Sequence, residues 1–144
     1  MIRILIAEDH VVVRSSLKRL CELMGDIIVA GEAASGEEVI ELLHAKQFDM
    51  ILLGMNMSGP GGVDLVERIR AQHERLPILI HNMNDEPHLA KRVLQAGASG
   101  YVAKARGHDI LMSAICKVAV GERFIDPAIA GSMTVDNLAR ANRV

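Results

Sequence analysis

The chain has 144 residues, half of them apolar, and a formal net charge of −2. This length and apolar content suffice for one domain with a packed core and argue against intrinsic disorder. Acidic and basic residues are mixed without a basic block, so this segment offers no electrostatic reason to bind nucleic acid. No apolar run is long enough to span a membrane, and acidic residues follow the first run too closely for a signal peptide. We therefore expect a cytoplasmic protein.

Short apolar runs alternate five times with longer amphipathic stretches along the chain. The runs are nearly continuous rather than alternating, which is typical of strands that are covered on both faces. They predict strands at Ile2–Ala7, Ile27–Ala33, Phe48–Leu53, Ile78–His81 and Tyr101–Ala103.

The stretches between these runs have the period of helices. The first carries an apolar stripe from Val13 to Met24 and ends at Gly25, a residue type common just beyond helix ends. The second begins at Ser35, and Glu38 three residues later gives the spacing of a capping box. The other three are marked by apolar residues at helical spacing: Leu65, Val66 and Ile69; Leu89, Val93 and Ala96; Leu111, Ala114, Ile115 and Val118. The alternation predicts an α/β fold, a doubly wound (βα)5 architecture of the flavodoxin-like type with a five-stranded parallel sheet.

The segment from Asp126 onwards and the two cysteines have their own sequence signals. Asp126 followed by Pro127 predicts the start of a short helix, with Asp126 as the N-cap. We expect one domain over residues 1–125 and a short helix and linker tail over 126–144. Cys21 and Cys116 both lie in helical patterns beside apolar residues, and we interpret them as two buried small hydrophobes rather than a redox pair.

Small and polar residues follow the ends of the predicted strands. In parallel α/β sheets the functional site lies at the carboxyl ends of the strands, near the point where the strand order reverses. We therefore expect residues that are far apart in sequence to converge there: Glu8, Asp9, Gly54, Asn82 and Lys104.

Five ordered stretches also carry a family resemblance: Ile4–His10, Phe48–Leu53, Asn56–Gly59, Pro77–Ile80 and Ala96–Lys104. The resemblance covers roughly residues 1–130, and the five stretches together are far more specific than any one alone. On these stretches the chain resembles a response-regulator receiver domain of two-component signal transduction. The resemblance is to the NarL/FixJ subfamily, whose receivers precede LuxR-type DNA-binding domains.

The resemblance implies roles for individual residues. Glu8 and Asp9, with the backbone carbonyl of Asn56, would face Mg²⁺, and Lys104 would pair with a phosphate. Tyr101 would be the aromatic switch residue, whose exposure changes on activation. The resemblance also implies phosphorelay signalling, transcription regulation, a sensor histidine kinase as a candidate partner, and a DNA-binding domain beyond this chain.

Three positions depart from the family pattern. Gly54 stands at the phosphoacceptor position, Asn82 at the Ser/Thr switch position, and Ser58 where proline is usual. Glycine has no carboxylate, so no acyl phosphate can form at Gly54. Asp49 cannot substitute, because five residues along an extended strand place it about 16 Å away. One lost carboxylate also weakens the Mg²⁺ site, so we predict that no cofactor is required and that the protein is not an enzyme.

The function predicted from the sequence is an atypical receiver that is not phosphorylated. It would dimerise or dock a protein partner through its first and fifth helices or through the face around Tyr101. As an alternative, the chain is an ordinary receiver that carries an introduced Asp→Gly change. A flavodoxin-like flavin or nucleotide binder is a third hypothesis, but the glycines at 59, 61 and 62 do not match a phosphate loop.

Two details stay open at this stage. Tyr101 is either a functional switch or an aromatic residue that partly covers its face. His10 and His81 suggest a metal site beside the acidic pair, although no tight ligand spacing supports it.

Overall fold

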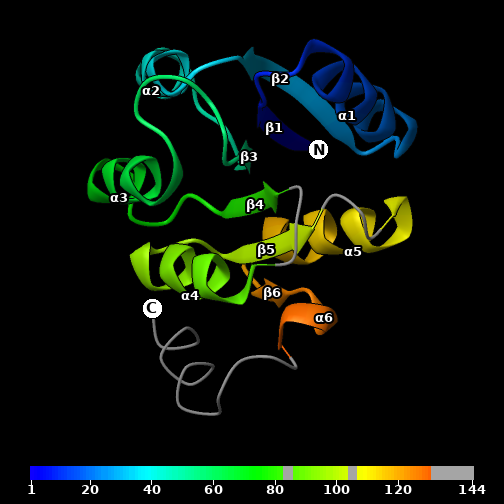
Figure 1. Cartoon of the computed structure of the whole chain (residues 1–144). Coiled ribbons are helices and arrows are strands. Elements are labelled where there is room, and N and C mark those ends of the chain that lie inside the picture. Colours follow the sequence, from blue (N-terminus) through cyan, green and yellow to red (C-terminus); the bar gives the residue numbers. More distant parts are fainter. Residues whose placement is uncertain (83–85, 104–106, 131–144) are drawn as a thin grey trace.

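A computed structural model describes residues 1–82, 86–103 and 107–130. Its strands form one sheet in the order β2-β1-β3-β4-β5-β6, and every neighbouring pair is parallel. Figure 1 shows this order running across the molecule. The strands are β1 Ile2–Ala7, β2 Ile27–Ala33, β3 Met50–Gly54, β4 Ile78–Asn82, β5 Gly100–Ala103 and β6 Phe124–Ile125. The doubly wound fold is confirmed. The sixth strand was not predicted, because its two residues are too few to show a period.

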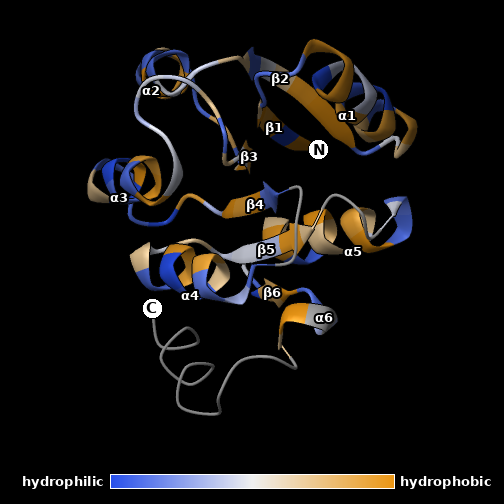
Figure 2. Cartoon of the chain, in the orientation of Figure 1, coloured by the Kyte–Doolittle hydropathy of each residue, from blue (hydrophilic) through white to orange (hydrophobic). Residues whose placement is uncertain are grey.

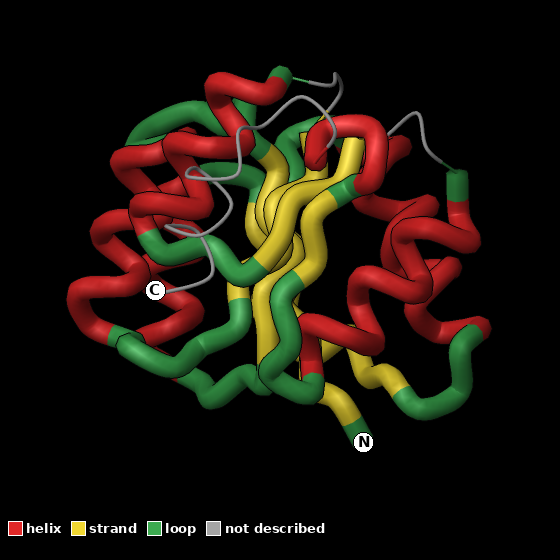
Figure 3. Tube along the Cα trace, turned by 90° about the horizontal axis from the view of Figure 1, so that it is seen from below, coloured by secondary structure: helices red, strands yellow, loops and turns green. Residues whose placement is uncertain are grey.

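Helices cover both faces of the sheet (Figure 3). The helices α1 Val11–Leu23 and α5 His108–Ala119 share a core cluster on one face. The helices on the other face are α2 Gly36–Ala45, α3 Gly62–Gln72, α4 Pro87–Ala96 and α6 Pro127–Ala130. In β1, Ile4 and Ile6 face α1 and α5, whereas Leu5 and Ala7 face the other layer, and all four are buried. Burial on both faces explains the continuous apolar runs, and β2 and the body of β4 are orange in Figure 2.

Local signals in the sequence set the helix ends. Ser35 Oγ accepts a hydrogen bond from the Glu38 backbone N–H at 3.2 Å, as the capping-box spacing predicts. The Glu38 side chain in turn accepts from the Ala34 N–H at 2.6 Å. Gly25 and Gly97 follow α1 and α4 with φ of 83° and 121°, a region that glycine enters without a steric penalty.

The two cysteines differ in their surroundings. Cys21 is fully buried, as expected. Cys116 is exposed, so the expectation that it is buried is wrong. Cys116 lies on the outer side of α5, one residue beyond the inward-facing Ile115. Burial, and to a lesser extent the charge of Glu22, raises the pKa of the Cys21 thiol to about 11. The thiol therefore stays protonated and unreactive at neutral pH.

The segment after α5 packs against the edge of the sheet. Strand β6 pairs with β5, and an added Cβ at Gly100 would lie 2.5 Å from the Phe124 carbonyl oxygen, so glycine allows this close approach. The Asp126 N–H donates to the Tyr101 carbonyl at 3.1 Å, and the Asp126 carboxylate accepts from the Ala103 N–H at 3.4 Å. Ile129 of α6 is fully buried in the cluster that includes α4.

We expect Ile129→Ala to lower the free energy of unfolding by about 2–5 kcal/mol, because it removes a fully buried side chain and leaves a cavity. Ile28→Ala is the matched control, since Ile28 on β2 is 43% exposed, and should cost no more than about 1 kcal/mol. Urea denaturation of both variants measures the difference. Equal, small losses would show that α6 is not packed on the domain.

Candidate functional site

The parallel register brings the ends of the strands to one edge of the sheet. Ala7, the last residue of β1, pairs with Leu53 of β3, and Gly54 of β3 pairs with His81 of β4. Asn82 pairs in turn with Ala103, the last residue of β5. Three residues predicted for the site therefore lie at the ends of neighbouring strands: Glu8 directly follows β1, and Gly54 and Asn82 are the last residues of β3 and β4.

The acidic pair after β1 is held by backbone and side-chain contacts. Glu8 continues the pairing of β1 with β2, since its N–H donates to the Ala33 carbonyl at 2.9 Å. Its own carbonyl accepts from Arg14 Nη1 at 2.8 Å. Its carboxylate turns inward, with a side chain only 3% exposed, whereas the Asp9 side chain is 35% exposed. The buried carboxylate is thus fixed, and the second carboxylate faces solvent.

His10 joins the two acids into a cluster. Its backbone N–H donates to Glu8 Oε2 at 3.1 Å, and its Nδ1 lies 3.1 Å from the same oxygen and 3.3 Å from Asp9 Oδ1. One ligand atom from each of the three residues lies within 4.8 Å of the others. His81 is not part of this group; it lines a hollow of about 260 Å³ between α1 and α5 with Val13, Leu17 and Leu111.

Gly54 lies directly against Glu8. A Cβ added at Gly54 would be 2.9 Å from Glu8 Oε1 and 3.3 Å from the Ala7 carbonyl oxygen. The Glu8 carboxylate therefore occupies the room that a side chain at position 54 would need. The nearest atom is the far end of a flexible side chain, so a larger residue at 54 would require only that Glu8 turn aside.

The predicted roles of Asn56 and Lys104 stay predictions. Asn56 lies in the turn after β3 with an exposed side chain, and the role predicted for it concerns its backbone carbonyl. Lys104 lies outside the residues that the structure describes.

The two switch positions bond to each other. Asn82 Nδ2 donates to the Tyr101 hydroxyl oxygen at 2.9 Å, and the two residues are 4% and 0% exposed. Tyr101 also accepts the Asp126 N–H at its backbone carbonyl. The Tyr101 ring is fully buried in the core beside α4, and the choice between a switch residue and an aromatic that covers its face stays a prediction. The bond from Asn82 to Tyr101 could not be predicted from local patterns, since it depends on the paired ends of β4 and β5.

The family model described as response regulator receiver domain matches residues 4–116. The chain therefore belongs to the response-regulator receiver family of two-component systems, which are signalling rather than catalytic proteins.

Among individual proteins, the chain is similar to the response regulators UvrY and GacA. The chain is 33% identical over 138 residues to the response regulator UvrY of Escherichia coli, covering 96% of this chain and 63% of the relative. It is 32% identical over 135 residues to GacA of Pseudomonas viridiflava, covering 94% and 63% respectively. The chain thus spans 63% of the length of these curated relatives.

Solved structures agree with the fold and the subfamily. A LuxR-family two-component response regulator from Aurantimonas sp. superimposes with a TM-score of 0.89 at 31% identity, over 96% of this chain and 99% of that one. The isolated receiver domain of RcsB from Salmonella enterica gives 0.85 at 22% identity, over 92% and 99%, which supports the fold alone. The chain is thus a receiver domain of the LuxR-family type. Within the described ranges, no helix is long and apolar enough to cross a membrane.

Receiver domains typically bind Mg²⁺ at their phosphorylation site. The residues here fit that ion in part, because the carboxylates of Glu8 and Asp9 are hard oxygen ligands of the kind Mg²⁺ prefers. Gly54 supplies no side-chain oxygen, and Glu8 Oε2 already accepts a hydrogen bond from the His10 N–H. Glu8 and Asp9 would hold the ion, and its charge would offset the repulsion between their carboxylates.

We expect Asn82→Ala to release Tyr101 from its buried position, because it removes the amide that bonds to the hydroxyl. The chain has one tyrosine and no tryptophan, so its fluorescence reports on Tyr101 alone. Iodide should quench the variant more strongly than the wild type, and the free energy of unfolding should fall by about 1–3 kcal/mol.

Asn56→Ala is the matched control for this experiment, since Asn56 is exposed, and should change neither property by a measurable amount. Wild-type fluorescence that iodide quenches as readily as that of free tyrosine would contradict the buried position.

Proposed function

We propose that this receiver domain signals without being phosphorylated at Gly54. The observation that carries the proposal is the residue at the carboxyl end of β3, which has no carboxylate to attack a phosphoryl group. Glu8 turns its carboxylate into the vacant room, with Oε1 2.9 Å from the position of an added Cβ. The Glu8 carboxylate thus lies where a phosphoacceptor side chain would begin.

Asp49 offers no replacement for the missing acid. It precedes β3, at the opposite end of that strand from Gly54, and its Oδ2 accepts the Arg3 backbone N–H at 2.7 Å. A carboxylate there is separated from Glu8 and Asp9 by the length of the strand.

The buried bond between Asn82 and Tyr101 supports the same proposal. A hydroxyl at position 82 would be free to turn toward a new charge, whereas the Asn82 amide is already bonded to the tyrosine hydroxyl. We propose that this bond holds Tyr101 in one position, so that the state of the domain does not depend on a phosphoryl group.

Response regulators pair with a sensor histidine kinase and often dimerise. We propose that this chain regulates transcription by dimerising or by docking a protein partner, and that it acts in the cytoplasm. Residues 1–125 would form the receiver, and residues 126–144 would lead toward a DNA-binding domain. A sensor histidine kinase remains a candidate partner.

A second candidate is an ordinary phosphorylatable receiver that carries an introduced Asp→Gly change. One observation favours it: an added side chain at Gly54 would meet mainly the flexible end of Glu8, so an aspartate fits at low cost. Glu8 and Asp9 also retain the positions that an Mg²⁺-dependent reaction would use.

Acetyl phosphate with Mg²⁺ distinguishes these proposals when the protein is analysed by mass spectrometry under denaturing conditions. We expect the wild type to gain no acid-labile phosphoryl group, because position 54 has no nucleophile. Gly54→Asp restores a carboxylate, and Gly54→Asn is the matched control of nearly the same size without one.

A stoichiometric acid-labile adduct on the wild type would refute the proposal. An adduct on Gly54→Asp that appears together with increased iodide quenching of Tyr101 would favour the introduced change. No adduct on Gly54→Asp, or an adduct without any response of Tyr101, would favour a naturally atypical receiver.

A further inference from the structure

Three arginines converge at the edge of the sheet opposite to Glu8 and Gly54. Arg70 comes from α3, Arg75 from the loop after α3, and Arg123 from the residue before β6. They line a hollow of about 200 Å³ together with Glu74, Pro77, Gly97, Ser99 and Gly121.

Arg70 is fixed in place by neutral acceptors. Its Nε and Nη2 donate to the Gly97 carbonyl at 3.1 and 2.7 Å, and its Nη1 donates to the His73 and Glu74 carbonyls at 2.8 Å each. Gly97 admits this side chain, because an added Cβ there would lie 2.8 Å from Arg70 Cγ. The guanidinium is therefore held rigidly, and its charge is met by carbonyl oxygens.

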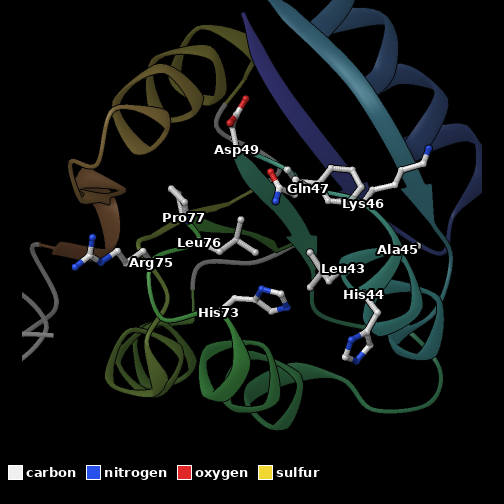
Figure 4. Close-up of a pocket in the computed structure, with 11 residues that line it drawn as sticks. Leu43, His44, Ala45, Lys46, Gln47, Asp49, His73, Arg75, Leu76 and Pro77 are labelled. Carbon is white, nitrogen blue, oxygen red and sulfur yellow. The ribbon is translucent and has the colours of Figure 1, made fainter.

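The other two arginines add charge to the same hollow. Arg123 is half-buried, and its Nη1 donates to the Ala98 carbonyl at 3.1 Å. Arg75 is exposed and makes no hydrogen bond or ion pair within the part of the chain that the structure describes. In Figure 4, its guanidinium points away from His73 and toward the side of the molecule where β6 lies.

The charge of this hollow opposes that of the whole chain. Three arginines less the carboxylate of Glu74 give the lining a formal charge of +2, while the chain carries −2. The larger hollow in Figure 4, about 780 Å³ and lined among others by His44, His73 and Asp49, also borders Arg75. All three arginines line the smaller hollow, whereas only Arg75 lines the larger one.

Half-buried like charges are unfavourable unless an anion lies between them. Burial lowers the pKa of both Arg70 and Arg123, and the charge of Arg123 lowers that of Arg70 further. Arg70 and Arg123 donate hydrogen bonds to backbone carbonyls that follow α3 and α4, so both side chains cap helix ends. Arg75 donates no such hydrogen bond among the described residues, so helix capping does not explain its place at the hollow.

We propose that this arginine-lined hollow binds a small tetrahedral oxyanion of the phosphate class. Guanidinium groups match the geometry of phosphate oxygens and donate charge-assisted hydrogen bonds to them. Ser99 lines the same hollow; its Oγ accepts the Ile78 N–H at 3.1 Å and its hydroxyl hydrogen can be donated to an anion. The volume admits a phosphate group and is smaller than the pockets of drug-sized ligands.

Free phosphate and a phosphate monoester share this chemistry. A bound anion would connect the ends of α3 and α4 to the start of β6, the strand that pairs with β5. The site is independent of Gly54, so the wild-type chain tests it whatever the outcome of the phosphorylation experiment.

A titration of the wild type with sodium phosphate at constant ionic strength tests the proposal by amide NMR shifts. We expect a saturable shift at Gly97 and Gly121, and none with sodium chloride. Arg75→Gln should weaken phosphate binding about tenfold, since one charge-assisted hydrogen bond is worth about that factor. Arg19→Gln, an exposed arginine on α1, is the matched control and should bind as the wild type does.

Glycerol phosphate is titrated in parallel to identify the source of the anion. Tighter binding of the ester indicates a ligand that carries its phosphate on a larger group, and equal or weaker binding indicates free phosphate. A linear, unsaturable response to phosphate, or equal affinity in the wild type and Arg75→Gln, would overturn the proposal and leave the arginines as structural caps.

Discussion

The close approach of Glu8 to Gly54 is the contact on which the rest of the site depends. Parallel pairing of β1 with β3 brings the two residues together, and the absent side chain leaves room for the Glu8 carboxylate. A buried carboxylate is costly unless hydrogen bonds stabilise its charge. The His10 N–H supplies one such bond, so a glycine on one strand and a backbone donor after the neighbouring strand together fix the conformation of Glu8.

A series of buried contacts runs from the end of β4 to the β6 edge of the sheet. Asn82 and Tyr101 form a buried polar pair between β4 and β5, and Asp126 bonds to the backbone of β5 on both sides of Val102. Ile129 then fixes α6 in the core. These contacts connect the ends of β4 and β5 to Asp126 and α6, and each is buried and hydrogen-bonded or tightly packed.

The fold and the position of the site could be predicted from the sequence because they depend on local patterns. Buried strands give continuous apolar runs, and Ser35 and Gly97 mark helix ends by their own backbone chemistry. The bond from Asn82 to Tyr101 and the burial of Ile129 could not be predicted, because they depend on which side chains meet in space. Cys116 was placed wrongly because the pattern around it identified the helix but not its outward face.

A crystal structure of the wild type grown with Mg²⁺ and beryllofluoride tests the central claim most directly; the same phosphomimetic was used with the RcsB receiver domain. We expect the Glu8 carboxylate to lie over Gly54 and no beryllofluoride to be bound between the ends of β1 and β3. Density for beryllofluoride coordinated there, or a Glu8 side chain turned out to solvent with the room above Gly54 filled by another residue, would contradict it.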